Sequence, residues 1–288
     1  MQEYPFGSKL RPWVSLNPRA RRLTDGDPTT CPHKSRLHAM TGAKQQLPTG
    51  LPELSLGRVG TTAQDDIDES LRLLREMQED VKPQARIRAY RPVPTVAFSR
   101  RESLMPEFAG ASAAARRLGF DPVIRLAGGR AVAYDQTCLV IDLMAPLALF
   151  DNHIAAFDAG AACFRDVLSD LGIDARVGPV PGEYCAGAHS VNARGQVKIV
   201  GLAQRAMRRS RLLTACIVLE APDRLRPVVD AVYSAMKLDW SRESLGSVRD
   251  EGVQGSLDEV VHELVTGLQQ RHAAWALPQK TIVDGVLA

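Results

Sequence analysis

The order of the predicted secondary-structure elements constrains the fold of this 288-residue chain more than any other feature. Short strand-like runs follow one another in groups, and the predicted helices lie between these groups. A regular alternation of strands and helices would predict a parallel sheet, whereas runs of strands are typical of an α+β fold. We therefore expect an α+β domain in which helices flank a mostly antiparallel sheet.

Several segments have the apolar spacing or the end signals of helices. The clearest covers residues 154–171, where apolar residues recur three and four positions apart and Gly172 marks the end. A helix through residues 67–78 has Asp65 or Asp66 as its expected N-cap. Further helices are expected between Pro106 and Gly119, over residues 222–238, and over residues 256–270, where Ser256 and Glu259 form a capping box.

Strand-like runs occupy much of the remaining chain. Residues 122–126 and 131–143 are separated by a diglycine, and we expect them to pair like a hairpin. A turn at residues 193–195 separates a short run at 191–192 from a longer one at 196–202. The other runs lie at residues 85–90, 95–98 and 212–219.

The first 60 residues contain seven prolines, and nine Lys and Arg against four Asp and Glu, without any apolar periodicity. Such a segment cannot bury a large apolar face. We therefore predict that residues 1–52 form a disordered basic extension and that residues 53–288 form one folded domain. The extension is either a functional arm or dispensable, with translation starting at Met40 as one explanation.

Composition and charge exclude several classes of protein. No segment approaches the ~18–20 apolar residues of a transmembrane helix, and the first thirty residues lack the apolar core of a secretory signal, so we expect a cytoplasmic protein without membrane contact. A net charge of +3 does not favour nucleic-acid binding. Five cysteines without a CxxC pair fit neither a disulfide framework nor a zinc ribbon, and we expect no metal.

The diglycine Gly128-Gly129 lies between two apolar runs, where backbone without side chains can approach a ligand or form a bulge. It lacks the spacing of a dinucleotide-binding fingerprint or a P-loop. Taken alone, the diglycine is more simply explained by an ordinary bulge or turn than by a ligand site.

Cys185 differs from the other cysteines because it lies in a loop flanked by glycines. It could therefore act as a nucleophile if a nearby cation stabilised its thiolate. Lys198, in a strand that a turn folds back toward this loop, is the candidate cation. The alternative is an inert loop cysteine and a solvent-facing lysine. The other cysteines lie in the extension or in apolar runs, where they are expected to be buried: Cys31, Cys138, Cys163 and Cys216.

Together, the segments IRLAGGRAVAYD and KIVGLAQR resemble two motifs of the biotin/lipoate protein ligase family. The similarity runs from about Glu53 to the C-terminus and includes PTVAFSR at residues 94–100. It implies the catalytic-domain fold of that family. The Tyr-Cys-x-Gly segment at residues 184–187 is similar to the subgroup of cysteine-dependent octanoyltransferases and lipoyl (octanoyl) amidotransferases.

The resemblance implies roles for individual residues. Cys185 matches the acyl-thioester nucleophile, and Lys198 matches the lysine that activates it. Substrate-binding positions are Arg125, Gly128, Gly129 and Gly201. Ile124 and Ala127 depart from the arginine and serine usual in the first motif, so the contacts of those side chains are not transferred.

The activity implied is transfer of an octanoyl or lipoyl group to a lysine, without a bound cofactor. The donor is octanoyl-acyl carrier protein or an acylated glycine cleavage H protein. The acceptor is H protein or the lipoyl domain of a 2-oxoacid dehydrogenase. Two alternatives remain: a lipoate–protein ligase, which would need ATP and Mg, and an inactive paralogue that binds acylated carriers.

Two further features concern the surroundings of this site. His189 lies four residues after Cys185 and is a candidate to assist the thiol, although the resembled subgroup uses lysine instead. The run Arg205, Arg208, Arg209 and Arg211 is either a solvated hairpin tip or a docking surface for an acidic carrier protein.

Overall fold

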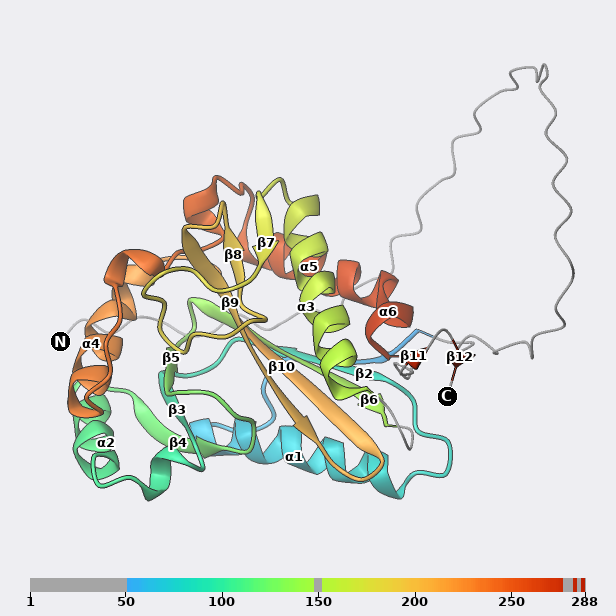
Figure 1. Ribbon diagram of the computed structural model, residues 1–288, viewed down its shortest axis with the longest axis horizontal. Helices are drawn as coiled ribbons and strands as arrows, with labels where there is room; N and C mark the ends of the chain where they lie inside the picture. The colour runs from blue at the N-terminus through green and yellow to red at the C-terminus, as the bar shows by residue number, and fades with distance from the viewer. Residues whose placement is uncertain (1–50, 148–151, 277–281, 284–285, 288) are drawn as a thin grey trace, which may run out of the picture. The chain divides into compact units, whose positions relative to one another are not determined.

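A seven-stranded sheet with the order β1-β2-β6-β10-β9-β8-β7 lies at the centre of the fold (Figure 1). In the computed structural model, the described residues are 51–147, 152–276, 282–283 and 286–287. Only β1 and β2 are parallel, and the other neighbours are antiparallel, as the sequence predicted. The strands are β1 (Glu53–Leu56), β2 (Arg86–Tyr90), β6 (Cys138–Pro146), β7 (Ala175–Val177), β8 (Val191–Ala193), β9 (Val197–Ala206) and β10 (Ser210–Val218).

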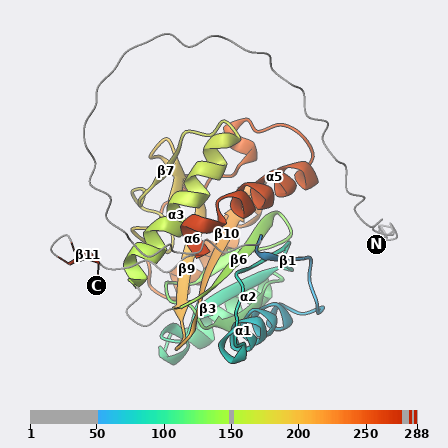
Figure 2. The same ribbon diagram turned by 90° about the vertical axis from the view of Figure 1, so that its right-hand side faces the viewer.

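The two faces of the large sheet have different coverings because side chains alternate along each strand. Leu213, Ala215 and Ile217 of β10 belong to a core with helices on one face. Figures 1 and 2 show these helices together at one side of the sheet: α3 (His153–Asp170), α5 (Leu257–Gln270) and α6 (His272–Ala276). The alternate residues of β10, among them Thr214 and Cys216, line a pocket on the other face.

A second, three-stranded sheet has the order β4-β3-β5, formed by β3 (Thr95–Ser99), β4 (Asp121–Arg125) and β5 (Val132–Tyr134). The hairpin predicted for residues 122–126 and 131–143 is therefore wrong. β4 pairs with β3 in parallel, β5 pairs with β3 in the antiparallel direction, and β6 joins the large sheet. The apolar side chains of this small sheet share a core with α2 (Phe108–Arg117) and α4 (Arg226–Ala235).

Most predicted helices are confirmed, with corrections at their ends. Thr62, not Asp65 or Asp66, caps α1 (Ala63–Glu79), because Asp65 occupies the third helical position and accepts from the Thr62 N–H instead. Ser256 and Glu259 form the predicted capping box of α5. The helix predicted over residues 222–238 is shorter and consists of a 3₁₀ turn, η2 (Pro222–Arg224), followed by α4.

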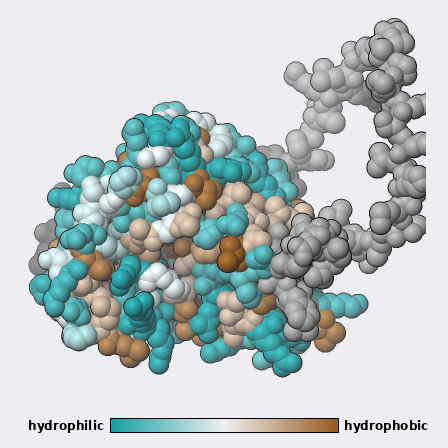
Figure 3. Space-filling model, in the orientation of Figure 1, coloured by the Kyte–Doolittle hydropathy of each residue, from teal (hydrophilic) through white to brown (hydrophobic). Residues whose placement is uncertain are grey.

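The remaining described elements are short. Three are further 3₁₀ turns: η1 (Glu102–Leu104), η3 (Arg242–Ser244) and η4 (Arg249–Glu251). Ile282–Val283 and Val286–Leu287 pair as β11 and β12. Residues 1–50 of the predicted extension lie outside the described residues. Hydrophilic residues predominate on the face shown in Figure 3, with small scattered apolar groups. Among the described residues, no helix is both long and apolar enough to cross a membrane.

Candidate active site

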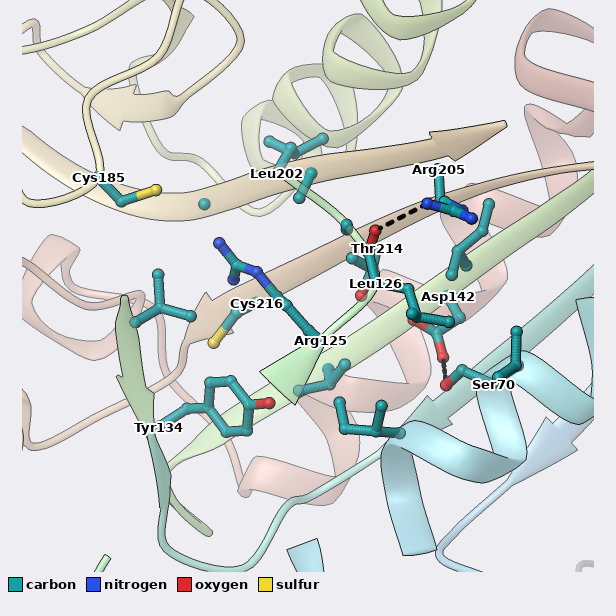
Figure 4. A pocket seen from close by; sticks show the side chains of 18 of the residues that line it. Ser70, Arg125, Leu126, Tyr134, Asp142, Cys185, Leu202, Arg205, Thr214 and Cys216 are labelled. Carbon is teal, nitrogen blue, oxygen red and sulfur yellow. Dashed lines mark hydrogen bonds between the residues drawn. The ribbon is translucent and has the colours of Figure 1, made fainter. Parts of the chain in front are cut away.

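A pocket lies on the face of the large sheet opposite α3, α5 and α6, next to the segment that follows β4. Figure 4 shows Cys185 and Ser70 at opposite ends of it. The walls are mainly apolar and include Ile67, Leu71, Leu74, Val132, Val140 and Leu212. An apolar slot that ends at a cysteine is suited to a flexible hydrocarbon chain with a reactive carbonyl.

Small side chains of the large sheet leave space for this pocket. Gly201 of β9 lies opposite Cys216 of β10, and Ala203 lies opposite Thr214. All four line the pocket. Gly201 was expected to bind substrate, and the structure places it in the pocket wall, where a Cβ would lie 3.4 Å from Lys198 Cε.

Cys185 has a left-handed backbone conformation, with φ 46°, which is uncommon for a residue other than glycine. Its N–H and its Sγ each form a hydrogen bond, in addition to the one that its carbonyl accepts from Lys198. Its N–H donates to the Tyr233 hydroxyl at 2.7 Å, and its Sγ accepts from the Arg130 N–H at 3.2 Å. The sulfur therefore lies against the end of the diglycine turn, and this contact joins the first motif to the Tyr-Cys-x-Gly segment.

The two glycines of the turn have different roles. A Cβ on Gly129, whose φ is +97°, would lie 2.8 Å from Arg125 Nη2 and 3.0 Å from Cys185 Sγ, whereas a Cβ on Gly128 would meet nothing within 4 Å. Neither glycine lines the apolar pocket; both line shallow grooves outside it. The structure therefore places the two glycines, which the resemblance assigns to substrate binding, outside the apolar pocket, where Gly129 makes room for the thiol and the guanidinium.

Arg125 is the cation that faces the thiol across Gly129. Its Nη2 donates to the carbonyls of Gly128 and Arg130, both at 2.8 Å, and so holds the turn closed. Its Nε is buried and has no partner among the described residues. In Figure 4 the guanidinium extends between Cys185 and Cys216. A buried N–H without a partner is costly unless a ligand accepts from it.

Lys198 lies beneath the cysteine loop and is only 1% exposed. Its Nζ donates to the carbonyls of Cys185 at 2.8 Å and Tyr184 at 3.0 Å, and lies 3.4 Å from Glu183 Oε1. The predicted closeness of Lys198 to the cysteine loop is present, but the ammonium contacts the backbone of the loop. This geometry indicates that Lys198 fixes the conformation of Cys185.

Sequence reasoning missed two buried glutamates that hold these segments. Glu183 accepts from the N–H groups of Val180 and Gly187 and from the Ser190 hydroxyl, and it pairs with Lys198. Glu102 accepts from Ser99 and from the Ala131 N–H at the end of the diglycine turn. The only sequence signal was the position of Glu183 in a glycine-rich loop, two residues before the cysteine.

The other end of the pocket is polar and buried. The Ser70 hydroxyl donates to Asp142 Oδ2 at 2.5 Å, shown as a dashed line in Figure 4. Behind this pair, Arg88 Nη1 donates to Ser70 Oγ and lies 3.5 Å from Asp142, and its Nη2 donates to Asp66. Burial raises the pKa of the Asp66 carboxyl, against the opposing effect of Arg58 and Arg88. Sequence reasoning did not find this network.

The other described cysteines differ from Cys185 in their burial or in the pKa of their thiols. Burial raises the pKa of the Cys163 thiol to about 11. Cys216 was expected to be buried; it is half-buried and faces the pocket, but a hydrogen bond with Cys138 and desolvation raise the pKa of its thiol well above the ordinary value. Cys138 is buried as predicted, and Cys31 lies outside the described residues.

His189 does not contact the thiol. Its Nε2 lies 2.8 Å from Asp158 Oδ1, and its ring is stacked on Phe157 with the centroids 3.8 Å apart. Its position near Cys185 is nevertheless as predicted, because both residues line one shallow groove.

Of the four arginines of the predicted basic run, three are exposed, Arg205, Arg208 and Arg209. Arg211 is buried, and it donates to the Trp275 carbonyl. Arg209 donates to the carbonyls of Gln78 and Asp80, while Arg205 donates to that of Leu126 at 3.5 Å. In the part of the chain that the structure describes, no three His, Cys, Asp or Glu side chains are grouped to hold a metal.

Comparisons with known proteins identify relatives of this chain. A relative from Oceanobacillus iheyensis, named octanoyl-GcvH:protein N-octanoyltransferase, is 26% identical over 152 residues, which cover 51% of this chain and 53% of the relative. One of the same name from Exiguobacterium sibiricum is 33% identical over 90 residues, which cover 31% and 33% of the two chains. The chain therefore matches about half the length of these relatives or less.

Solved structures share the fold. A lipoate-protein ligase A bound with ATP is 20% identical, with a TM-score of 0.60 over 82% of this chain and 91% of that one. A bipartite lipoate protein ligase from Thermoplasma acidophilum is 22% identical, with a TM-score of 0.55 over 81% and 89%. The sequence model of the lipoyl protein ligase A/B catalytic domain matches residues 66–269. This chain belongs to the lipoyl protein ligase A/B catalytic domain family.

Proposed function

We propose that the protein is an acyltransferase that moves an octanoyl or lipoyl group through a Cys185 thioester to a lysine of an acceptor protein. One observation carries the proposal. Among the described cysteines, Cys185 has a sulfur that accepts from a backbone N–H and lies across Gly129 from Arg125, and it lines both the apolar pocket and a surface groove. The relatives named as octanoyltransferases support the same activity.

In the first step, the Cys185 thiolate attacks the carbonyl carbon of the donor thioester, and the carbon–sulfur bond to the donor breaks. The donor leaves as a thiolate and takes up the proton that Cys185 released. The Arg125 guanidinium and the Arg130 N–H favour negative charge at the sulfur. The unpartnered Arg125 Nε is available to the carbonyl oxygen as its charge develops.

The acyl chain lies in the apolar pocket during both steps. Each buried CH₂ contributes about 0.8 kcal/mol, so the chain itself supplies much of the binding free energy. A thioester is activated for aminolysis, and the second step therefore needs neither ATP nor a metal. ATP and Mg would enter only if the protein were a lipoate–protein ligase, in which Lys198 contacts an acyl-adenylate and Cys185 is incidental.

The partners follow from the chemistry of the two steps. The names of the relatives point to the glycine cleavage H protein, as acylated donor or as acceptor. The structure of the Thermoplasma ligase was described together with its E2 lipoyl domain, which supports a lipoyl domain as acceptor. We include octanoyl-acyl carrier protein as a donor because it presents the same acyl thioester. These reactions belong in the cytoplasm.

The experiment is a transfer assay from an octanoyl thioester donor to a lipoyl domain, with and without ATP, for the wild type and Cys185→Ser. We expect ATP-independent transfer by the wild type and none by the variant, because a serine hydroxyl is a much weaker acid than a thiol. ATP-dependent transfer by Cys185→Ser would identify a ligase. No turnover by the wild type with any donor would identify an inactive acyl-carrier-binding protein.

A further inference from the structure

Two shallow grooves meet the diglycine turn outside the acyl pocket, and their chemistry differs. One, the arginine groove, is lined by Arg100, Arg101 and Arg130 together with Gly128 and Gly129. The other, the histidine groove, includes Cys185 and is lined by Phe157, His189, Leu202 and Gln204. Asp158, the partner of His189, is exposed beside it. Glu102 also lines the first groove, but it is buried and hydrogen-bonded to Ser99 and the Ala131 N–H. The exposed arginines of the first groove therefore disfavour an ammonium group, whereas the Asp158 carboxylate beside the second favours one.

His189 is held in one orientation within its groove. Its ring stacks on Phe157 at an interplanar angle of 11°, and its Nε2 is hydrogen-bonded to the Asp158 carboxylate. An ionised carboxylate only accepts, so Nε2 carries the hydrogen and Nδ1 of the neutral ring is an acceptor. Nδ1 makes no hydrogen bond to any of the described residues. A histidine oriented by a carboxylate, with its second nitrogen free, is the arrangement of a general base.

Resting on the proposed acyl transfer, we infer that the acceptor's lysine enters the histidine groove and that His189 is the general base of the second step. A lysine amine has an unperturbed pKa of about 10.4 and is therefore protonated at neutral pH. It must lose a proton before its nitrogen can attack. Phe157 and Leu202 offer apolar walls to the methylene stem, and Asp158 offers a negative charge to the ammonium.

The second step moves two protons and exchanges one bond. His189 Nδ1 takes one proton from the lysine ammonium, and the Asp158 carboxylate stabilises the resulting imidazolium. The amine nitrogen forms a bond to the thioester carbon, and the bond from that carbon to Cys185 Sγ breaks. The second proton leaves the nitrogen and protonates the departing sulfur. His189 then releases its proton to water, and the products are an amide and a free Cys185 thiol.

Single-turnover decay of the octanoyl enzyme tests this role. The full chain is loaded with a chemically activated octanoyl thioester, and loss of the acyl mass is followed by mass spectrometry. Three nucleophiles are compared: the lysine of glycine cleavage H protein, propylamine, which is protonated at neutral pH, and methoxyamine, which is not. The variant is His189→Gln, whose amide keeps a donor for Asp158. The matched control is His262→Gln, on the surface of α5.

We expect His189→Gln to slow decay with H protein and propylamine by about 100-fold, the usual contribution of a general base. Decay with methoxyamine should stay within about twofold of the wild type, because that amine needs no base. His262→Gln should change none of the three rates. An equal loss of decay rate with all three nucleophiles would show that His189 only positions the loop. Unchanged decay rates would show that the acceptor's lysine enters elsewhere. Either result overturns the inference. If the wild type never holds an octanoyl group on Cys185, the proposed function fails first.

Discussion

The two ends of the acyl pocket are built in different ways. At the open end, Cys185 lies in a loop, where it is hydrogen-bonded to the Tyr233 hydroxyl, the Lys198 ammonium and the Arg130 N–H, and faces Arg125 across a glycine. At the closed end, Arg88 and Asp142 are each only 1% exposed and belong to one network with Ser70 and Asp66. Two surface grooves meet the diglycine turn at the open end, and Cys185 lines one of them, whereas Ser70, Arg88 and Asp142 of the closed end line neither.

The open end is built for the reaction, and the closed end stabilises the fold. Residues in sparsely populated backbone conformations, such as the half-buried Cys185 with its positive φ, are typical of functional sites, where geometry matters more than stability. Buried ion pairs leave an uncompensated charge when one partner is removed, so their loss lowers stability strongly. Substitutions at the open end should therefore change the reaction, and those at the closed end should change folding and the length of chain that fits.

The largest expected effect is at the closed end. Arg88→Met removes the cation between Asp66 and Asp142, and we expect the free energy of unfolding to fall by about 3–5 kcal/mol in denaturant titrations. Arg176→Met, which breaks the exposed pair with Asp174, is the control and should cost less than about 1 kcal/mol. Similar small costs for both would show that the closed end does not hold the fold.

At the open end, Gly129→Ala should slow acylation of Cys185 by about 100-fold while the protein remains folded, since small displacements of a reacting group have effects of this size. The added Cβ must displace Arg125 or the thiol, and alanine is strained at φ +97°. Gly128→Ala is the matched control, because a Cβ there meets nothing, and its rate should stay within about twofold. Equal acylation rates for the two variants would contradict the role assigned to Gly129.

A smaller effect concerns the length of the chain between the two ends. Removing two CH₂ groups, from octanoyl to hexanoyl, should weaken binding about tenfold, at about 0.8 kcal/mol for each group. Decanoyl donors should gain nothing further, since the added carbons would meet Ser70 and Asp142. Competition between donors in single-turnover acylation measures these ratios. Affinity that rises steadily up to dodecanoyl would show that the polar network does not close the pocket.

Local sequence patterns predicted much of this molecule. The apolar stripe of α3, the capping box of α5 and the turn before β9 depend on neighbouring residues, and all three are present. The pairing of β4 and β5 was missed because both pair with β3, which precedes them by a whole helix. Long-range strand pairing is not specified by local periodicity.

The candidate site, too, could be predicted from the sequence only where it depends on neighbouring residues. Cys185 and Lys198 were found because each lies in a short distinctive segment, but the sequence could not show whether the sulfur or the carbonyls of the loop would face the lysine. Arg88, Ser70 and Asp142 come from β2, α1 and β6, and none of them has a distinctive sequence context. Only the assembled fold brings these three side chains together.

The central claim is that Cys185 carries the acyl group, and intact-protein mass spectrometry tests it most directly. The protein is incubated with octanoyl-acyl carrier protein without ATP, next to Cys185→Ala and a Cys216→Ala control. We predict one added octanoyl mass on the wild type and on Cys216→Ala, removable by hydroxylamine, and none on Cys185→Ala. An octanoyl adduct that persists in Cys185→Ala, or transfer to a lipoyl domain without any adduct on the wild type, would contradict the claim.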